Sequence, residues 1–386
     1  MHKVEFLDLH LHTKHSLASS KKGGIESFAE YAKLKGVDYV ATGDILHGVY
    51  VKEASKLLKE ESYGLYSFFG AKFFLSAEVS LIYRDEEKCR RIHVLVLFPD
   101  FRSVEKARGM LKDFGKLESD GRPILKIGIE DFFLMMKNIS EDIILIPAHI
   151  WTPHFSLLGG KSGYDSIPTK IQKHISALET GLSSDPYMCS MNKDAASFSF
   201  VSFSDAHSPQ LIGREATIVN ENVETIVKLK NILEERRIYG TVEFFPQEGK
   251  YFLTGHRKCS FKTNKQMKIC PVCQKQLTEG VFNRIESLPR SDRKYDKKSF
   301  YVLPVEEYVK MFVATDNAKH KKSDALREML EKMPEMEIKV TADEKTIAKT
   351  FTQEFAEFCI TVRKQRVKIE EGYDGVYGKI KSAEER

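Results

Sequence analysis

Side chains that commonly bind metal ions lie at the ends of separate apolar segments in the first 207 residues. A mixed set of imidazole and carboxylate donors favours zinc, manganese or iron over calcium, which prefers oxygen alone. Two such ions about 4 Å apart would suit the hydrolysis of a phosphate ester. The segments are VEFLDLHLH (4–12), FFLSAE (73–78), RIHVLVLF (91–98), IILIPAH (143–149) and FVSFSDAH (200–207), and their candidate ligands are His10, His12, Glu78, His93, His149, Asp205 and His207.

His10 and His12 alternate with leucines, so on a strand both imidazoles project from the same face. Asp8 shares that face and could orient an imidazole through a hydrogen bond. Asp44 and His47, in ATGDILH, close another apolar segment and are further candidates. Any one histidine could instead be a satisfied core residue. Together, however, these groups would leave many unpaired polar atoms in an apolar core, which is unfavourable unless metal ions bind them.

The apolar segments are expected to be buried strands separated by amphipathic helices. Two more strands, at 39–42 and 175–179, bring the number to about seven, and helices are predicted at 25–35, 104–111 and 223–236. Strands that alternate with helices pair in parallel and can close into a barrel whose strand ends meet at one face. The predicted fold class is α/β, a distorted (β/α)7 barrel, with domains at 1–245 (barrel), 246–295 (basic zinc-binding module) and 296–386 (helical C-terminal region).

Clustered cysteines mark the second of these units. The residues His256, Cys259, Cys270 and Cys273 have the spacing of a tetrahedral structural zinc site. Between positions 251 and 300 there are 12 Lys/Arg and 4 Asp/Glu, a net charge of +8 in a chain whose total is +5. Such a segment is typical of a nucleic-acid-binding surface, and a solvated charged linker is the alternative.

The C-terminal region is expected to contain a long helix over 343–366, shorter helices at 305–313 and 324–333, and a terminal turn or short hairpin over 372–381. No apolar stretch reaches the roughly 18 residues of a membrane span. No secretory signal is visible, and the six cysteines are too few and too clustered for a disulfide framework. The cytoplasm is therefore the expected compartment.

The ordered motifs DLHLHTKHS, TGDILH, SAEVS, RIHVLV, IPAH and FSDAH resemble those of the polymerase-and-histidinol-phosphatase (PHP) metallo-phosphoesterases. The resemblance covers roughly residues 4 to 240 and implies a distorted barrel with two or three bound metals. Ala18 stands where many members have an acidic residue or a histidine, so the set of ligands for a third ion is incomplete. The resemblance implies one ion at His10, His12, Glu78 and Asp205, a second at Glu78, His93 and His149, a third at Asp44, His47 and His207, and catalytic roles for Asp205, Glu78 and His149.

The zinc module, the following GVFNRIESLPR and the terminal GYDGVYGKIK are similar to the endonuclease Q subgroup of DNA repair enzymes. This resemblance spans nearly the whole chain. It implies a metal-dependent endonuclease that cleaves DNA 5′ of uracil, hypoxanthine, xanthine or an abasic site. Zn²⁺ is the expected cofactor at the catalytic and structural sites, and Mg²⁺ or Mn²⁺ is an alternative at the catalytic site. Damaged DNA is the expected partner, and a sliding clamp is a candidate that no motif here identifies.

An enzyme that selects a damaged base must extrude it from the helix and recognise it in a pocket. Trp151, His154 and Phe155 follow directly after the candidate ligand His149 and are the expected substrate contacts. Two other functions remain open. One is a phosphatase of a small phosphorylated metabolite, which would have no use for a basic module. The other is a non-catalytic DNA-binding scaffold, against which the near-complete ligand set argues.

Overall fold

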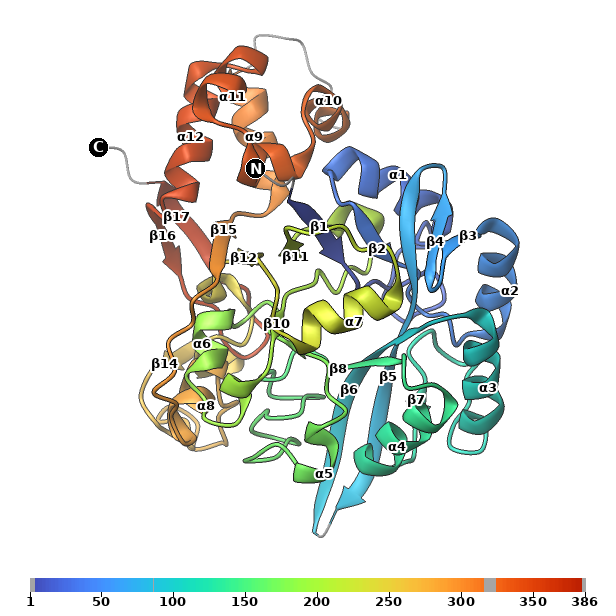
Figure 1. Cartoon of the computed structure of the whole chain (residues 1–386). Helices are drawn as coiled ribbons and strands as arrows, with labels where there is room; N and C mark the ends of the chain where they lie inside the picture. The colour runs from blue at the N-terminus through green and yellow to red at the C-terminus, as the bar shows by residue number, and fades with distance from the viewer. Residues whose placement is uncertain (1–3, 86, 316–323, 384–386) are drawn as a thin grey trace.

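The computed structural model describes residues 4–85, 87–315 and 324–383 (Figure 1). Within these residues, a mixed central sheet forms the middle of the molecule and the C-terminal helices gather at one end. Helices pack around the sheet, and a small cysteine-containing segment lies beside it. The architecture is therefore a mixed α/β fold with a central sheet.

The central sheet has the strand order β15-β12-β11-β1-β2-β5-β4-β3; β5 also pairs with β6 and β7, and β6 with β8. β1, β2 and β5 pair in parallel, as expected of strands joined through helices. The strands are β1 (Glu5–Asp8), β2 (Tyr39–Ala41), β3 (Lys59–Ser62), β4 (Leu65–Phe68), β5 (Ala71–Asp85), β6 (Lys88–Phe98), β7 (Ile124–Leu125), β8 (Ile144–Pro147), β11 (Ala216–Val219), β12 (Gly240–Phe244) and β15 (Lys298–Val302).

The strands β5 and β6 form a long antiparallel hairpin, and β6 is antiparallel to β8 as well. The expectation of parallel pairing is therefore wrong at β6. Because β6 follows β5 with no room for a crossover helix, the chain must reverse its direction there. The register pairs His93 with Ser80, two residues beyond Glu78, so that Glu78 and His93 project from the same face of the hairpin.

Backbone hydrogen bonds continue from β8 back to β1. The N–H of Ser176 donates to a carbonyl of β8, and β9 (Leu178–Glu179) pairs in parallel with β10 (Phe200–Val201). After β10, Ala206 exchanges backbone hydrogen bonds with the residues that follow β1, including one from the N–H of His12 at 2.8 Å. The segments that carry the candidate ligands are thereby adjacent in space.

Amphipathic helices pack against the sheet. The helices predicted at 25–35, 104–111 and 223–236 correspond to α1, α3 and α7, and those predictions are confirmed. α1 buries Ile25, Phe28 and Ala32 on one face and ends at Gly36, whose φ of 73° is the left-handed conformation that glycine favours. The helices of this part are α1 (Ile25–Lys35), α2 (Gly48–Leu57), α3 (Phe101–Leu111), α4 (Ile129–Ile139), α5 (Thr169–Gln172), α6 (Pro186–Ser190) and α7 (Ile226–Glu234).

The cysteine-containing segment begins with an antiparallel hairpin formed by β13 (Thr254–His256) and β14 (Phe261–Thr263). It ends with the short helix α8 (Val281–Ser287). Asn283 in α8 holds the two ends together, because its side-chain oxygen accepts from the N–H of Thr254 and its amide donates to the carbonyl of Asn264.

The C-terminal helices enclose a second apolar core, separate from that of the sheet. The helices predicted at 305–313 and 324–333 are confirmed as α9 (Val305–Thr315) and α10 (Ala325–Lys332). The single long helix over 343–366 is wrong: α11 (Glu344–Thr350) and α12 (Gln353–Arg363) replace it. The break occurs because the Thr352 hydroxyl accepts from the N–H of Phe355 and starts a new helix.

The chain ends in the antiparallel hairpin β16 (Val367–Glu370) and β17 (Lys379–Ala383), as the glycines in its turn predicted. The turn packs on the segment after β12, where Gly372 and Gly378 donate to the carbonyls of Gln247 and Glu248. Among the helices of the described ranges, none is both long enough and apolar enough to cross a bilayer.

Candidate metal centre

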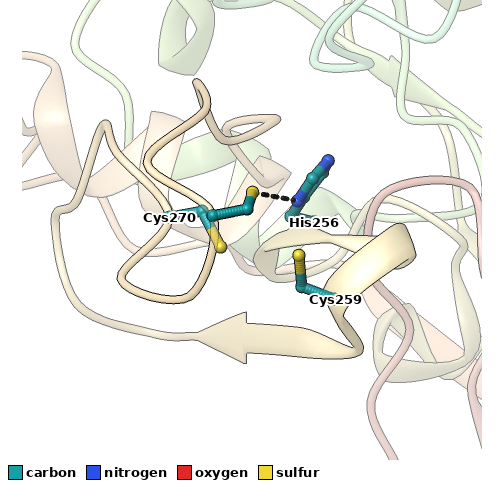
Figure 2. Close-up of side chains that lie close together, drawn as sticks. His256, Cys259 and Cys270 are labelled. Atoms are coloured by element: carbon teal, nitrogen blue, oxygen red, sulfur yellow. Dashed lines mark hydrogen bonds between the residues drawn. The ribbon is translucent and has the colours of Figure 1, made fainter.

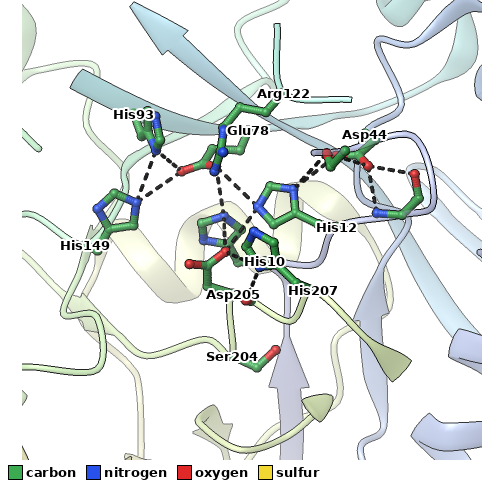
Figure 3. Close-up of polar contacts among 12 residues, drawn as sticks. His10, His12, Asp44, Glu78, His93, Arg122, His149, Ser204, Asp205 and His207 are labelled. Carbon is green, nitrogen blue, oxygen red and sulfur yellow. Dashed lines mark hydrogen bonds and ion pairs between the residues drawn. The ribbon is translucent and has the colours of Figure 1, made fainter. Parts of the chain in front are cut away.

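The first group of candidate ligands contains His10 and His12, after β1, and Asp205, after β10 (Figure 3). The Nε2 atom of His12 lies 3.1 Å from Oδ1 of Asp205, and that of His10 lies 3.6 Å from it. Both Nε2 atoms and this oxygen are buried without a hydrogen-bond partner. Three unpaired polar atoms that point to one place are unfavourable by themselves but fit a bound cation.

The second group contains Glu78, His93 and His149. The Oε1 atom of Glu78 lies 2.7 Å from Nδ1 of His93 and 3.2 Å from Nε2 of His149. Its other oxygen, Oε2, faces the first group and lies 3.3 Å from Nε2 of His12. Glu78 therefore presents one oxygen to each group, which is the arrangement that a carboxylate bridging two ions requires.

Carboxylates and hydroxyls orient these imidazoles from behind. Oε1 of Glu179 lies 2.8 Å from Nδ1 of His10, and Oε2 accepts the backbone N–H of His149. The Thr152 hydroxyl lies 3.0 Å from Nδ1 of His149. Such contacts fix the tautomer and leave Nε2 free for a metal. Asp8, which the sequence suggested for this role, instead accepts the backbone N–H groups of Ser204 and Gly213.

Asp44 also lies behind an imidazole, with Oδ1 3.2 Å from Nδ1 of His12. Its second oxygen accepts from the hydroxyls of Thr13 and Ser16. The ring of His47 stacks on that of His15, with centroids 4.2 Å apart, and His207 lies 3.5 Å from Asp205. Across the described residues, the predicted third set of Asp44, His47 and His207 does not converge on one point as the first two groups do.

Burial and charge act in opposite directions in the centre. Burial opposes protonation of His10 and His12, but the surrounding carboxylates outweigh it and raise the pKa of both above 6.5. Burial also opposes ionisation of Glu78 and Asp205, yet neighbouring histidines lower the pKa of each. Burial lowers the pKa of His93 to about 4, against the effect of Glu78. The ionised carboxylates and the neutral His93 are thus in the forms that bind metals, whereas a cation held by His10 and His12 must displace the protons that their raised pKa values favour.

The backbone is strained at three of these positions. Asp44, His149 and Asp205 have φ values of 41°, 31° and 46°, in the left-handed region that non-glycine residues rarely adopt. Gly181 lies against His149 with a φ of 76°, and a Cβ atom there would be 2.5 Å from the Cβ of His149. Strained conformations of this kind concentrate at functional sites, where the surrounding fold maintains them.

A cavity of about 470 Å³ opens onto the centre and includes His93, His149 and Asp205 in its wall. His154 and Phe155 line it, as the sequence suggested. Trp151 does not: its side chain is 1% exposed and belongs to the core, so its prediction as a base contact is corrected. The other lining groups that bear on chemistry are Arg122, Arg214, Lys250, Tyr251 and Tyr377.

No protein-family model matches the chain. The lesion-specific endonuclease PfuEndoQ from Pyrococcus furiosus is similar, with a TM-score of 0.84 and 30% identity over 98% of this chain and 95% of that one. A structure of endonuclease Q with a 27-mer duplex substrate containing an abasic lesion has a TM-score of 0.83 and 31% identity, over 98% of this chain and 96% of that one. The chain belongs to the endonuclease Q family.

An uncharacterized protein of Methanocaldococcus jannaschii is 28% identical over 283 residues, 67% of this chain, but the matched part spans only 35% of that protein. Membership of the endonuclease Q family makes this protein an endonuclease, a metal-dependent hydrolase of phosphodiester bonds. The candidate metal groups described above agree with that class of enzyme.

Arg122, which the sequence did not identify, also contacts the metal centre. Its Nη1 atom lies 3.1 Å from Oε2 of Glu78, and its side chain is partly open to the cavity. No apolar pattern or motif surrounds it in the sequence, because it lies in the loop before the short strand β7. Arg122 places a fixed positive charge beside the carboxylate that faces both metal groups.

The four predicted zinc ligands of the cysteine-containing segment also converge. Figure 2 shows three of them, His256, Cys259 and Cys270. Their donor atoms lie within 4.8 Å of one another, and Sγ of Cys273 is 3.3 Å from Nδ1 of His256. Burial would raise the pKa of the Cys270 thiol, but backbone N–H groups of Val272 and Cys273 lower it to about 7. A thiol that ionises near neutral pH, in a group of three sulfurs and one nitrogen, fits a tetrahedral metal site.

Proposed function

We propose that this protein cleaves DNA on the 5′ side of a damaged nucleotide, with deaminated bases (uracil, hypoxanthine and xanthine) and abasic sites as its lesions. The observation that carries the proposal is the pair of donor groups that share Glu78 at the wall of a cationic cavity. The abasic duplex bound by a related endonuclease Q supports damaged DNA as the substrate class.

We further propose that the sheet is a distorted (β/α)7 barrel within a domain over 1–245, followed by a zinc-binding module at 246–295 and a helical region at 296–386. The backbone contacts from β8 through β9 and β10 to the residues after β1 support the barrel. The separate apolar core of the C-terminal helices supports the last boundary.

Two divalent cations are proposed for the centre, one held by His10, His12 and Asp205 and the other by His93 and His149, with Glu78 between them. Zinc is proposed for the cysteine group, and zinc, magnesium or manganese for the centre, since its donors are nitrogen and oxygen. When bound, such ions would polarise the phosphodiester and lower the pKa of an attacking water.

The protein's own residues have separable roles in this proposal. Asp205 and His149 line the cavity where a phosphodiester would lie, and the buried Glu78 contacts both metal groups behind them; these three are the proposed catalytic residues. Arg122, Arg214 and Lys250 would bind the DNA phosphates, and their positive charges would favour the negative charge that develops during hydrolysis.

His154 and Phe155 are proposed as contacts to the extruded nucleotide, together with the neighbouring Tyr251. The ring of His154 lies 6.4 Å from that of Tyr251, so the two form an aromatic side of the cavity. Aromatic faces stack on bases without requiring one base type, which would suit an enzyme that accepts several lesions.

The proposal is tested with labelled duplexes that contain an abasic site, uracil, hypoxanthine, xanthine or no lesion, using EDTA-treated and metal-restored protein. We expect cleavage of the phosphodiester on the 5′ side of the lesion, and only after metal is restored. Asp205→Asn should abolish it, and the exposed Asp113→Asn, with the same charge change, should not.

Two results would refute this function. Hydrolysis of small phosphate esters by a protein that leaves the damaged duplexes uncut would indicate a phosphatase. One zinc per chain and no hydrolysis with any metal would indicate a DNA-binding scaffold.

A further inference from the structure

The loop over 150–165, called here the His149 loop, connects the metal centre to the cysteine-containing segment. It starts directly after His149, and its Thr152 hydroxyl contacts Nδ1 of that ring at 3.0 Å. Further along, the carbonyl of Phe155 accepts the backbone N–H of His93 at 3.1 Å. The rings of Phe155 and His93 are 4.8 Å apart. One loop therefore contacts both histidines of the second metal group.

The His149 loop is packed tightly on itself. Leu158 donates its N–H to the carbonyl of Ile150 at 2.8 Å, and Tyr164 donates to Leu157 at 2.7 Å. A Cβ atom at Gly159 would lie 2.0 Å from the carbonyl oxygen of Thr152, so only glycine fits there. The glycines of this loop serve close packing within it. A displacement at one end of such a unit would be transmitted to the other.

Arg284, in α8, joins this loop to the cysteine-containing segment. Its Nε donates to the carbonyl of Leu158 at 2.8 Å, and its Nη2 donates to the carbonyl of Tyr164 at 2.9 Å. Nη2 also lies 2.6 Å from Oδ1 of Asp165. The Arg284 side chain is only 11% exposed, so these bonds form in a largely desolvated position. Arg284 thus spans the middle and the end of the loop.

A second arginine holds the same loop from the sheet. Arg90, in β6, donates to the carbonyl of Gly163, and its guanidinium lies 3.8 Å from the centre of the Tyr164 ring. The tyrosine hydroxyl is in turn 2.9 Å from that of Tyr83. Because these contacts do not involve α8, the loop retains an anchor when Arg284 is removed. Loss of Arg284 should loosen the loop without unfolding it.

We propose that Arg284 is a positioning residue: through the His149 loop it fixes His149 and His93, and so makes the metal affinity of the second group depend on the cysteine-containing segment. The proposal rests on the proposed function only in that this group binds a catalytic ion. Arg284 itself lies neither in the wall of the cavity nor in a metal group. The cysteine-containing segment would then also determine the geometry of the proposed catalytic centre.

The test compares Arg284→Ala, Arg284→Lys and Asp165→Asn in the full-length chain. Catalytic-ion affinity is measured without DNA by competition with a chelator, zinc per chain by elemental analysis, and kcat and KM on an abasic duplex. We expect Arg284→Ala to lower the affinity for the catalytic ion by about tenfold or more, as the loss of a contact that supports a metal ligand does. The zinc of the cysteine group should remain, and kcat should fall more than KM rises.

Arg284→Lys should recover part of the affinity, because an ammonium can still donate to one carbonyl. Asp165→Asn should change little, since the Asp165 side chain is 72% exposed and both carbonyl bonds persist. Unchanged ion affinity in Arg284→Ala, with only KM raised, would overturn the proposal and leave Arg284 a role in DNA binding.

If Arg284→Ala loses the structural zinc, the decision falls to Arg284→Lys, where wild-type ion affinity and kcat would overturn it. The ion measurement needs no substrate, so it separates failure of this proposal from failure of wild-type protein to cut damaged DNA.

Discussion

A buried ionic triad connects α1 to the C-terminal region, and replacing its central carboxylate should strongly destabilise the protein. Glu335 lies between two lysines, with Oε2 2.6 Å from Nζ of Lys35 and Oε1 2.5 Å from Nζ of Lys339. All three side chains are at most 1% exposed. The Lys339 ammonium also lies 5.1 Å from the centre of the Tyr308 ring. Glu335→Gln would leave two buried ammonium groups without the carboxylate that both of them contact.

Removing one partner of a buried ion pair typically destabilises a protein by about 3 to 5 kcal/mol. We expect Glu335→Gln to reach at least that range, because two cations lose the same partner. The control is Glu30→Gln, which breaks the ion pair of α1 with Arg327 in α10, across the same contact between regions. Those side chains are 44% and 60% exposed, so the loss should stay within about 1 kcal/mol.

Denaturant unfolding monitored by circular dichroism measures both changes. Burial raises the pKa of Glu335, but the two lysines outweigh it and lower that pKa below 4.5. The contribution of this carboxylate is therefore present above about pH 4.5 and disappears as pH falls through the lowered pKa. The gap between wild type and Glu335→Gln should narrow in acid. If Glu335→Gln destabilised no more than Glu30→Gln at pH 7, the triad would not be desolvated and this reasoning would be wrong.

Three other predictions concern the metal groups and the core. Cys270→Ser should lose the bound zinc and lower the Tm, as elemental analysis and a thermal melt would detect, because a structural zinc contributes to folding directly; retention of zinc would contradict the ligand set. Gly181→Ala should reduce activity and catalytic-ion affinity because its Cβ would be 2.5 Å from that of His149, whereas Gly70→Ala, with a φ of 81° and open space around it, should lose only stability. Burial and a neighbouring carboxylate raise the pKa of Glu215, so its favourable contribution to stability is present below pH 4.5 and is lost as pH rises through the raised pKa. Glu215→Gln should therefore be more stable than wild type at pH 8 by about 1 kcal/mol or more. Equal stability of the two proteins in denaturant titrations would contradict this.

The positions of the candidate ligands could be predicted because they follow apolar strands. A buried strand has a two-residue period, which put His10 and His12 on one face, and strand ends in an α/β fold lie near one another. The spacing of His256 and the cysteines was equally informative, since the tetrahedral geometry of a metal site limits the intervening loops. Both signals come from residues that are near one another in the sequence, so they do not depend on contacts between distant segments.

The contacts that orient the ligands could not be predicted, because they depend on register between distant segments. Glu179 lies at the end of a predicted strand, yet only the position of β9 beside β8 and β10 places its two oxygens on His10 and His149. Arg122 reaches Glu78 from a loop with no sequence pattern. The burial of Trp151 likewise follows from how the His149 loop closes, which proximity to a ligand in sequence does not determine.

The strained backbone at Asp44, His149 and Asp205 explains why the metal centre needs so much support around it. Each left-handed non-glycine residue is unfavourable by roughly 1 to 3 kcal/mol, and the unpaired buried nitrogens add to that. Such a site persists without its ions only if neighbouring contacts leave the chain no alternative. Asp44, for example, accepts hydrogen bonds from Thr13 and Ser16. The same reasoning makes the His149 loop the element most sensitive to mutation. His149 is positioned by the Thr152 hydroxyl, by the Glu179 carboxylate and by the arginines that hold the loop. Two of the hydrogen bonds that hold the loop come from Arg284, which lies outside the sheet.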